Sequence, residues 1–323
     1  MKNFSTALKA SAAVALSFSL AACSSTSSSA STSASSAAST AGSATTTAAV
    51  NSTWDLLDTT NLVKADLDLS NADGELKSIL DSGKLVVATS PDFPPAEYMD
   101  STTGKVKGAE MMLATYIAYN LGVDLEIETM DFNAVLTSVD TGKADLAISG
   151  FGYKKDRAEN FELSTGYSGT GSAACHTLLT FTDTVDDYKT LDDYSGKTIA
   201  AQTGSLQQMY VEDEIPGATL ELVTSIDQGI LDLQSKKVDA MALPCSNAQN
   251  YADSSDGLLA KSTVEFDLTP YAEYAGQVVA AKKGETSLID AVNSIIQTMT
   301  DNGYYSEWYL QACADAGVEP GDD

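Results

Sequence analysis

Short apolar runs alternate with longer amphipathic segments along most of this chain. The apolar runs at residues 85–89, 125–128 and 144–148 predict buried strands. Residues 110–121 are predicted to form a helix that ends at Gly122, because glycine readily adopts the left-handed conformation found after helices. Strands that alternate with helices in this order indicate a mainly parallel sheet, and therefore an α/β fold.

The pattern of the first half recurs weakly in the second half. Residues 83–90 (GKLVVATS) resemble residues 196–203 (GKTIAAQT), and residues 142–149 (GKADLAIS) resemble residues 236–243 (KKVDAMAL). Both segments of the second pair follow an amphipathic helix. Two α/β units of the same layout predict two lobes whose strand ends face one cleft.

The loop after the strand at residues 144–148 carries candidate binding chemistry. The strand breaks at Ser149 and Gly150, and Arg157 follows in the loop. Ligands in open α/β sheets bind beyond the carboxyl ends of the strands. A Ser-Gly turn offers a hydroxyl and backbone N–H groups there, and the planar guanidinium fork suits a carboxylate. From these residues alone, a surface loop with an exposed arginine is the alternative.

The amino end has the pattern of an export signal. Lys2 and Lys9 precede the apolar run at residues 10–20, which is too short to span a membrane. Small residues stand directly before Cys23, an arrangement that resembles a bacterial lipoprotein signal. The resemblance implies a signal peptide over residues 1–23 with lipidation at Cys23. Ordinary cleavage beside an incidental cysteine is the alternative.

A low-complexity tract follows this signal. Residues 24–49 contain only Ser, Thr, Ala and Gly, a composition that buries too little apolar surface to offset the entropy of ordering. We therefore predict a disordered tether over residues 24–52. Residues 51–71 are predicted to be an irregular extension that lies against the folded domain.

Composition and charge exclude several classes of function. A length of 323 residues suits about two domains. The formal net charge of −27 leaves too few cations to bind nucleic acid or an anionic lipid surface. His176 is the single histidine, which argues against a His-based metal site and against a Ser-His-Asp triad. We expect no metal, no cofactor and no catalytic residue.

Three cysteines remain beyond Cys23, namely Cys175, Cys245 and Cys313. An odd number leaves at least one of them without a partner in the chain, and no CxxC motif supports a metal. A pairing of Cys175 with Cys245 stays open. Our preferred interpretation is that all three are small buried apolar residues.

The order of motifs from residue 83 to residue 312 resembles the family-3 extracellular solute-binding proteins, the amino-acid-type receptors of ABC importers. The motifs that carry the resemblance are GKLVVAT (83–89), FPP (93–95), GKVKGAE (104–110), GKADLAISG (142–150), DR (156–157), AQTGSLQ (201–207), KVDA (237–240), KKG (282–284) and NGYY (302–305). The resemblance implies a two-lobed, type II periplasmic-binding-protein-like clamshell with two hinge strands. Its first lobe would hold residues 75–173 plus 277–312 and its second lobe residues 175–274, followed by an acidic tail at 313–323.

The resemblance also assigns roles to residues of the first lobe. Arg157 matches the family's arginine that grips the ligand α-carboxylate. Ser149 and Gly150 match the strand-end positions whose hydroxyl and backbone groups bind the ligand. Gly152 matches a position where many members have Ser or Thr, so only a backbone donor is left. Phe93 matches the aromatic residue that packs on the ligand side chain.

In the second lobe, Gly204, Ser205 and Gln207 match a turn at a helix start that aims N–H groups at the same carboxylate. The amino acid's ammonium group lacks its usual partner, because Pro244 stands where the family usually has an aspartate.

The acidic position of the first loop is likewise uncharged, as Ser90. A buried ammonium without a carboxylate would lose a charge-assisted bond of about 1.5–3 kcal/mol. Either Glu97 or Asn247 compensates, or the ligand is not a standard α-amino acid.

These expectations combine into a lipid-anchored, exported receptor on the outer face of the cell membrane. We expect a monomer that binds an amino acid or related small carboxylate between its lobes and delivers it to an ABC permease. Only the lipid anchor would touch the membrane. Two alternatives are a dehydratase-like enzyme of the same fold, with Glu97 as its acid, and a ligand sensor that feeds a signalling receptor.

Overall fold

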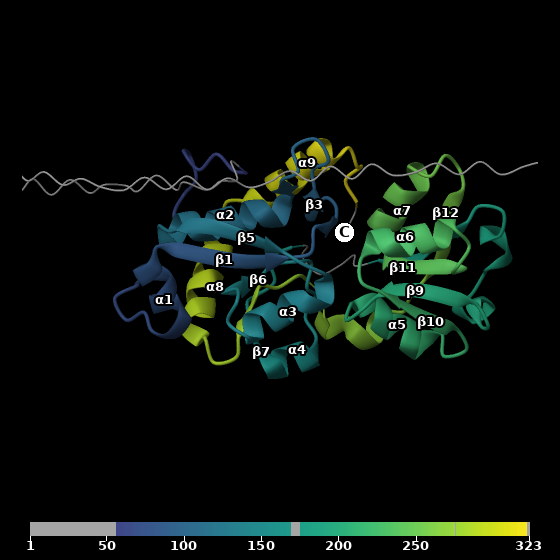
Figure 1. Cartoon of the computed structure of the whole chain (residues 1–323), viewed down its shortest axis with the longest axis horizontal. Coiled ribbons are helices and arrows are strands. Elements are labelled where there is room, and N and C mark those ends of the chain that lie inside the picture. The colour runs from purple at the N-terminus through teal and green to yellow at the C-terminus, as the bar shows by residue number, and fades with distance from the viewer. Residues whose placement is uncertain (1–55, 169–174, 275, 322–323) are drawn as a thin grey trace, which may run out of the picture. The chain divides into compact units, whose positions relative to one another are not determined.

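The structure is a computed structural model that describes residues 56–168, 175–274 and 276–321. The predicted signal peptide, the lipidation site Cys23 and the tether at residues 24–52 lie outside the described residues. Two five-stranded sheets, each accompanied by helices, form two lobes, which confirms the predicted α/β clamshell (Figure 1). Within the described ranges, no helix has both the length and the apolar character required to cross a membrane.

The sheet of lobe 1 has the strand order β5-β1-β6-β13-β7. β1 (Lys84–Thr89) pairs in parallel with β5 (Asp124–Thr129) and β6 (Leu146–Ala147). β13 (Ala280–Lys282) follows the return from lobe 2 and runs antiparallel to β6 and to β7 (Phe161–Leu163). The described helices of this lobe are α1 (Gly74–Ser82), α2 (Ala109–Leu121), α3 (Phe132–Asp140), α4 (Lys155–Asn160), α8 (Thr286–Asp301) and α9 (Tyr304–Ala316).

The sheet of lobe 2 has the order β10-β9-β11-β8-β12. β9 (Thr198–Gln202) pairs in parallel with β10 (Thr219–Val223) and β11 (Ala240–Pro244). β8 (His176–Phe181) runs antiparallel to β11 and to β12 (Leu259–Glu265). The described helices are α5 (Leu206–Glu214), α6 (Ile226–Gln234) and α7 (Cys245–Asp253), with short 3₁₀ turns at η1 (Val185–Asp187), η2 (Leu191–Tyr194) and η3 (Thr269–Tyr274).

The weak sequence repeat corresponds to a structural repeat. Just before β6, Asp145 accepts the Val86 N–H at Oδ2 over 2.6 Å, and its own N–H donates to the Val86 carbonyl over 2.9 Å. Just before β11, Asp239 makes the same two bonds with Thr198, over 2.8 Å and 2.7 Å. In each lobe an aspartate therefore fixes the third parallel strand against the first.

α2 is the central helix of lobe 1, and its sequence is apolar on most sides for that reason. It contacts β1 and β5 as well as α8 and α9. Leu113, Tyr116 and Ile117 have no exposed surface. A helix shows a clear apolar stripe only when its other face meets water, which this helix does not.

A small antiparallel sheet lies where the sequence predicts a loop at residues 90–95. It consists of β2 (Asp92–Phe93), β3 (Glu97–Met99) and β4 (Val106–Lys107). Strands of two or three residues are too short to show a period of two in the sequence. The sheet holds the side chains of β2 and β3 against lobe 2 and against the cleft.

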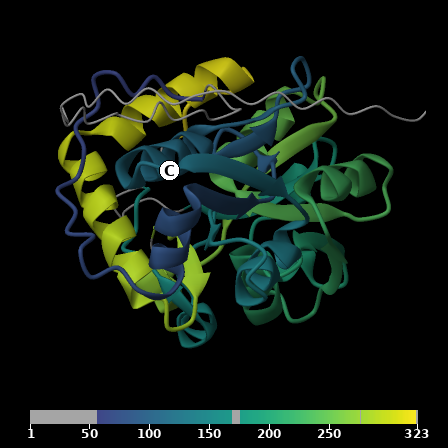
Figure 2. The same ribbon diagram turned by 60° about the vertical axis from the view of Figure 1, so that its left-hand side comes forward.

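The segment before α1 packs along lobe 1. Leu57, Leu62 and Leu67 contact its hydrophobic core, and the Val63 N–H donates to Tyr304 Oη over 3.0 Å. The purple segment accordingly follows the yellow helices in Figure 2. These contacts give structure to residues 56–73 without a helix or strand.

The last helix is longer than its sequence pattern indicates. We predict a helix over residues 304–312 and a tail from residue 313, but α9 continues to Ala316. Cys313 is buried and extends the apolar face by one turn, and the helix ends at Gly317 in the left-handed conformation. Acidic residues surround this last turn, so its composition suggests a tail although one of its faces is apolar.

Candidate functional site

A cavity of about 670 Å³ lies between the two lobes. This volume is within the range of roughly 300–1,000 Å³ typical of small-molecule sites. Most residues predicted to face a ligand line it: Phe93, Glu97, Ser149, Gly150, Gly152, Arg157, Ser205, Gln207 and Asn247. Gly204 does not line this cavity.

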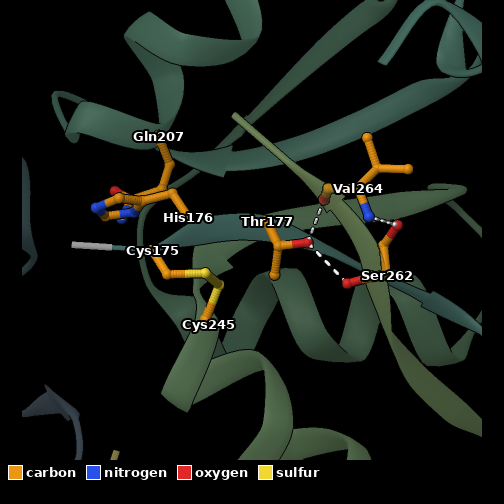
Figure 3. Close-up of a disulfide and its surroundings, with 7 residues drawn as sticks. All are labelled: Cys175, His176, Thr177, Gln207, Cys245, Ser262 and Val264. Carbon is orange, nitrogen blue, oxygen red and sulfur yellow. Dashed lines mark hydrogen bonds between the residues drawn. A yellow bond between two sulfur atoms is a disulfide. The ribbon is translucent and has the colours of Figure 1, made fainter. Parts of the chain in front are cut away.

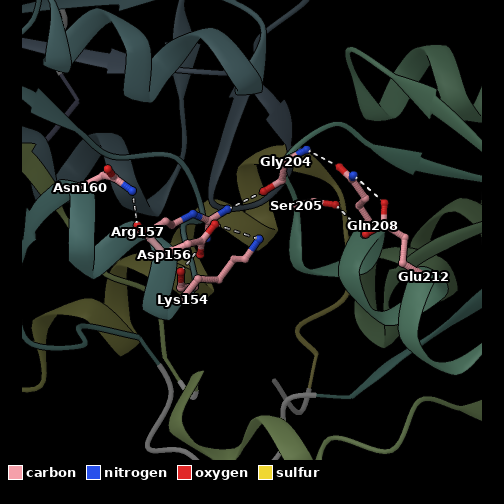
Figure 4. A network of polar contacts seen from close by, with 9 residues as sticks. Lys154, Asp156, Arg157, Asn160, Gly204, Ser205, Gln208 and Glu212 are labelled. Atoms are coloured by element: carbon pink, nitrogen blue, oxygen red, sulfur yellow. Dashed lines mark hydrogen bonds and ion pairs between the residues drawn. The ribbon is translucent and has the colours of Figure 1, made fainter.

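Arg157 lies in the short helix α4 and is not the exposed arginine of a surface loop. Only 6% of its surface is exposed, and its guanidinium carbon is 5.0 Å from the centre of the Phe151 ring. Nη1 donates to the Gly152 carbonyl and Nη2 to the Gly204 carbonyl, each over 2.6 Å, as Figure 4 shows for Gly204. Burial lowers the pKa of Arg157 to about 10, so the side chain stays charged at neutral pH.

This arginine therefore bridges the lobes, since Gly152 belongs to lobe 1 and Gly204 to lobe 2. Among the described residues that line the cavity, it is also the only cationic side chain at neutral pH. Two of its five N–H groups are used by the carbonyls, and three are left for an anionic group. The geometry suits a carboxylate in the cavity.

The strand-end turn after β6 is bonded to acids of its own lobe. Ser149 accepts the Ser90 N–H over 2.9 Å and donates from Oγ to Glu97 Oε1 over 3.1 Å. The Gly150 N–H donates to Glu110 over 2.9 Å. Gly150 has a φ of 59°, and a Cβ there would lie 3.3 Å from the Phe93 ring, so both backbone and space require glycine.

A pair of buried carboxyl groups, Glu97 and Glu110, lies beneath this turn. Their exposed fractions are 1% and 0%, and Tyr167 Oη donates to Glu110 over 2.5 Å. Burial and the neighbouring charge of Glu110 raise the pKa of Glu97 well above its usual range. Burial also raises the pKa of Glu110, although hydrogen bonds from its neighbours oppose this. Burial therefore favours the protonated form of this pair more than that of exposed carboxyl groups.

Glu97 and Asp92 differ in how many of their carboxyl oxygens accept hydrogen bonds. Glu97 lines the cavity, and its Oε2, which is itself buried, accepts no hydrogen bond from any described residue. Asp92 also lines the cavity, but it accepts from Ser90 Oγ over 2.9 Å and from lobe 2 at its other oxygen. Pro244 is part of the wall and brings no charge.

On the lobe 2 side, the start of α5 faces the cavity. Ser205 caps this helix by accepting the Gln208 N–H at Oγ over 3.1 Å. The N–H of Gly204 is directed to Gln208 Oε1, over 2.7 Å, and so is not presented to a ligand (Figure 4). Gly204 therefore differs from its expected role and serves instead as the carbonyl partner of Arg157.

Cys175 and Cys245 form a disulfide bond, and Cys313 is free and buried. Our preferred interpretation from sequence is wrong for the first two cysteines and fits the third. The two cysteines are 70 residues apart in sequence, but His176 and Pro244 are register partners on β8 and β11. The bonded sulfurs lie at this strand end beside the cavity (Figure 3).

A three-residue segment of lobe 1, residues 92–94, docks on lobe 2, and we call it the interlobe tongue. Asp92 Oδ2 accepts from Gln202 Nε2 over 2.9 Å and from the Ile226 N–H at the start of α6 over 2.7 Å. Phe93 packs against the hydrophobic cluster of lobe 2 that contains Ile226. Asn247 Nδ2 donates to the Pro94 carbonyl over 2.9 Å.

Sequence reasoning missed several wall residues, of which Asp92, Phe132, Tyr167, His176 and Gln202 are examples. Asp92 stands directly before the FPP motif, and Gln202 lies within the AQTGSLQ motif. Their places beside these motifs could therefore have predicted that they face the cavity. His176 and Tyr167 carried none, since their position depends on where the chain crosses between lobes.

Comparisons with known proteins agree with this geometry. The model of the bacterial extracellular solute-binding proteins, family 3, matches residues 85–312. The chain belongs to this family. It is 30% identical to the arginine-binding extracellular protein ArtP of Bacillus subtilis over 234 residues, which are 71% of this chain and 87% of ArtP. It is 24% identical to the L-cystine-binding protein TcyJ of Escherichia coli, over 72% of this chain and 83% of that protein.

A solved structure also resembles this family-3 solute-binding protein. It is an amino acid ABC transporter substrate-binding protein from Streptococcus pneumoniae, bound to L-arginine. The TM-score is 0.68 and the sequence identity 33%, with 77% of this chain and all of that chain covered. Both the fold and the family are therefore shared with receptors of amino acid transporters.

Proposed function

We propose that this solute-binding protein is a lipid-anchored extracellular receptor that binds an amino acid, or a closely related carboxylate, and delivers it to an ABC importer. The observation that carries the proposal is Arg157, a buried cation in the wall of the interlobe cavity with N–H groups to spare. Burial of a charge is costly, so a bound carboxylate, in addition to the neighbouring Asp156, would stabilise this arrangement.

The carboxylate would lie between Arg157 and the start of α5. The N–H groups of Leu206 and Gln207 belong to the first turn of that helix, where no intrahelical acceptor exists. A helix start also carries partial positive charge. Arg157 from lobe 1 and α5 from lobe 2 would thus hold the same anion, which favours closure of the lobes on the ligand.

The ammonium end of the ligand would be met by Glu97 rather than by Asn247. Glu97 lines the cavity and has an oxygen, Oε2, that accepts no hydrogen bond from a described residue, whereas Asn247 already donates to Pro94. The missing acids at Pro244 and Ser90 would then be replaced by a carboxyl group from β3. Burial raises the pKa of Glu97, and a nearby ammonium group would favour its ionised form.

The proposal includes a lipid anchor at Cys23 and delivery of the ligand to a transporter. Lipidation at Cys23 and the tether would hold a monomeric receptor at the outer face of the membrane, where the family's relatives act as binding proteins for transporters. Globomycin-sensitive processing and palmitate labelling of wild-type protein, lost in C23A, test the anchor.

The test of the ligand class is a thermal-shift screen of the twenty standard amino acids and L-cystine. A bound ligand at 100 times its Kd stabilises the folded state by about 2.7 kcal/mol, which raises the melting temperature measurably. We expect at least one amino acid to do so in wild-type protein and not in R157A. A screen in which no amino acid shifts the melting temperature contradicts the proposal.

A cleft enzyme is the second candidate, and the observation that favours it is the buried carboxyl group of Glu97 in the cavity wall. A carboxyl group with a raised pKa in a cavity wall is a suitable general acid for the loss of water. Mass spectrometry of each amino acid and hydroxy acid after incubation with the protein separates the two candidates. A receptor leaves every mass unchanged, and a dehydratase lowers one by the mass of water.

A further inference from the structure

His176 is the one histidine of the chain, and it lies at the cavity wall on the first residue of β8. Only 8% of its surface is exposed. Its ring is packed 5.1 Å from the ring of Tyr210, and Nδ1 is 3.0 Å from Gln207 Nε2 (Figure 3). These contacts fix the ring, and they come entirely from lobe 2.

The orientation of the Gln207 amide assigns the hydrogen of the ring. With Nε2 of Gln207 facing the ring, this nitrogen donates and Nδ1 of His176 accepts. A neutral imidazole then has its hydrogen on Nε2. Burial lowers the pKa of His176 to about 4, which keeps the ring neutral at physiological pH.

Among the described residues, the only hydrogen-bond contact of this ring is the one between Nδ1 and Gln207. The Nε2–H group is therefore not used by the protein's described groups. The side chain is nine-tenths buried and lines the cavity, so an acceptor that arrives with the ligand can take this hydrogen bond.

We propose that His176 is a ligand-contacting residue that donates a hydrogen bond from Nε2 to an oxygen atom of the bound amino acid. The inference rests on the proposed function and adds a specificity element to it. An oxygen acceptor, as in a carboxylate or carboxamide, satisfies this donor. A guanidinium or ammonium group does not, since it has only donors to offer. Any cationic end of the ligand must lie elsewhere, toward Glu97.

The single histidine makes a direct test possible in wild-type protein. Protein labelled with ¹⁵N-histidine and purified with a tag free of histidine gives only two ring-nitrogen signals. We expect a protonated Nε2 and an unprotonated Nδ1 in the free protein. Saturation with the amino acid that raises the melting temperature most among the twenty standard ones and L-cystine should shift Nε2 more than Nδ1.

Three outcomes of this titration would overturn the inference. They are unmoved ring signals in the saturated complex, an unprotonated Nε2 in that complex, and a larger shift of Nδ1 than of Nε2. The failure of every amino acid to raise the melting temperature is a different result, since it removes the proposed function and the inference with it.

Two substitutions give an independent measurement of affinity. H176F keeps a ring but removes the donor, and H176Q keeps an N–H donor at a similar distance from the backbone. We expect calorimetry to show a loss of roughly 10- to 100-fold for H176F, the range for a hydrogen bond to a charged group. H176Q should retain affinity within a few fold, and equal binding by H176F and wild type contradicts the inference.

Discussion

Arg157 has a structural task as well as the proposed binding task, because its two amino groups hold carbonyls of different lobes. A truncated side chain removes a donor from the buried Gly152 carbonyl and breaks the bond to Gly204, which is exposed. Charge alone does not replace the guanidinium, because its planar fork sets the directions of the bonds.

We expect R157A to weaken amino acid binding roughly 100-fold or more and to lower the free energy of unfolding by about 1–3 kcal/mol. R157K should restore part of the stability and little of the binding, since a lysine keeps the charge without the fork. Calorimetry and urea unfolding measure the two effects separately. Wild-type affinity in R157A would remove Arg157 from the site.

Glu97 gives the second prediction at the residue scale, through its proton. Burial raises the pKa of Glu97 in the free protein. An ammonium group that pairs with Glu97 would lower this pKa, so binding should release a proton where the free carboxyl group is protonated. Affinity should then rise with pH below the pKa of the free carboxyl group, and it should be constant at pH values above this pKa.

Calorimetry in two buffers of different ionisation enthalpy counts the protons released. We expect a release in wild-type protein near neutral pH and none in E97Q, which retains a similar shape. The same substitution at Glu128, which is half-buried and does not line the cavity, is the control. Binding without proton release in wild type would indicate that Glu97 stays neutral and does not meet a cation.

At the scale of elements, Asp145 before β6 and its counterpart Asp239 before β11 lead to a prediction about how stability depends on pH. Burial raises the pKa of Asp145 to about 7, well above the value of about 3.9 for an exposed aspartate. The folded state therefore binds more protons than the unfolded state between these values, and stability from this group falls as pH rises through the window. D145N keeps an acceptor for Val86 and carries no charge.

We expect the melting temperature of D145N minus that of wild type to be near zero at pH 4 and to increase up to pH 8. D239N changes the equivalent bond before β11 in lobe 2 and controls for the loss of a carboxylate acceptor. A difference that is constant across this range would show that the ionisation of Asp145 does not contribute to stability.

The elements also show how far the sequence could predict this molecule. Apolar runs predicted β1, β5 and β6, because a buried strand has a local apolar pattern. The repeat around Asp145 and Asp239 predicted two similar lobes. The short strands β2 and β3 have no such pattern in the sequence. The disulfide depended on the antiparallel register of β8 and β11, and such long-range pairing has no signature in local periodicity.

The candidate site divides along the same line. Arg157 and the turn at Ser149 could be placed in the cavity wall because they follow a strand that the sequence reveals. The directions of backbone N–H groups could not be predicted, since that of Gly150 depends on Glu110 and that of Gly204 on Gln208. His176 was used only as evidence against a metal and a catalytic triad, because nothing local places its ring at the cleft.

At the scale of the whole molecule, the interlobe tongue joins the lobes through the protein's own groups. Asp92 and Asn247 bond across the cleft without a ligand between them. Such bonds raise the population of closed receptor, and a receptor that is already closed binds with higher apparent affinity.

We expect D92A to shift unliganded protein toward an open form and to weaken amino acid binding roughly ten-fold, in line with the loss of one or two hydrogen bonds. Small-angle X-ray scattering reports the larger radius of gyration, and calorimetry the affinity. D131A is the matched control, because Asp131 is exposed at the start of α3 and makes no capping bond. An unchanged radius together with unchanged affinity would show that the tongue does not hold the lobes.

The disulfide has a mechanical consequence for this motion. Cys175 is the first described residue after the chain leaves lobe 1, and its bond to Cys245 joins that point to the start of α7. The bond keeps the start of β8 and the start of α7 together, so a change of angle between the lobes should not bend lobe 2 itself. We therefore expect His176 and Asn247 to move together as part of one rigid lobe.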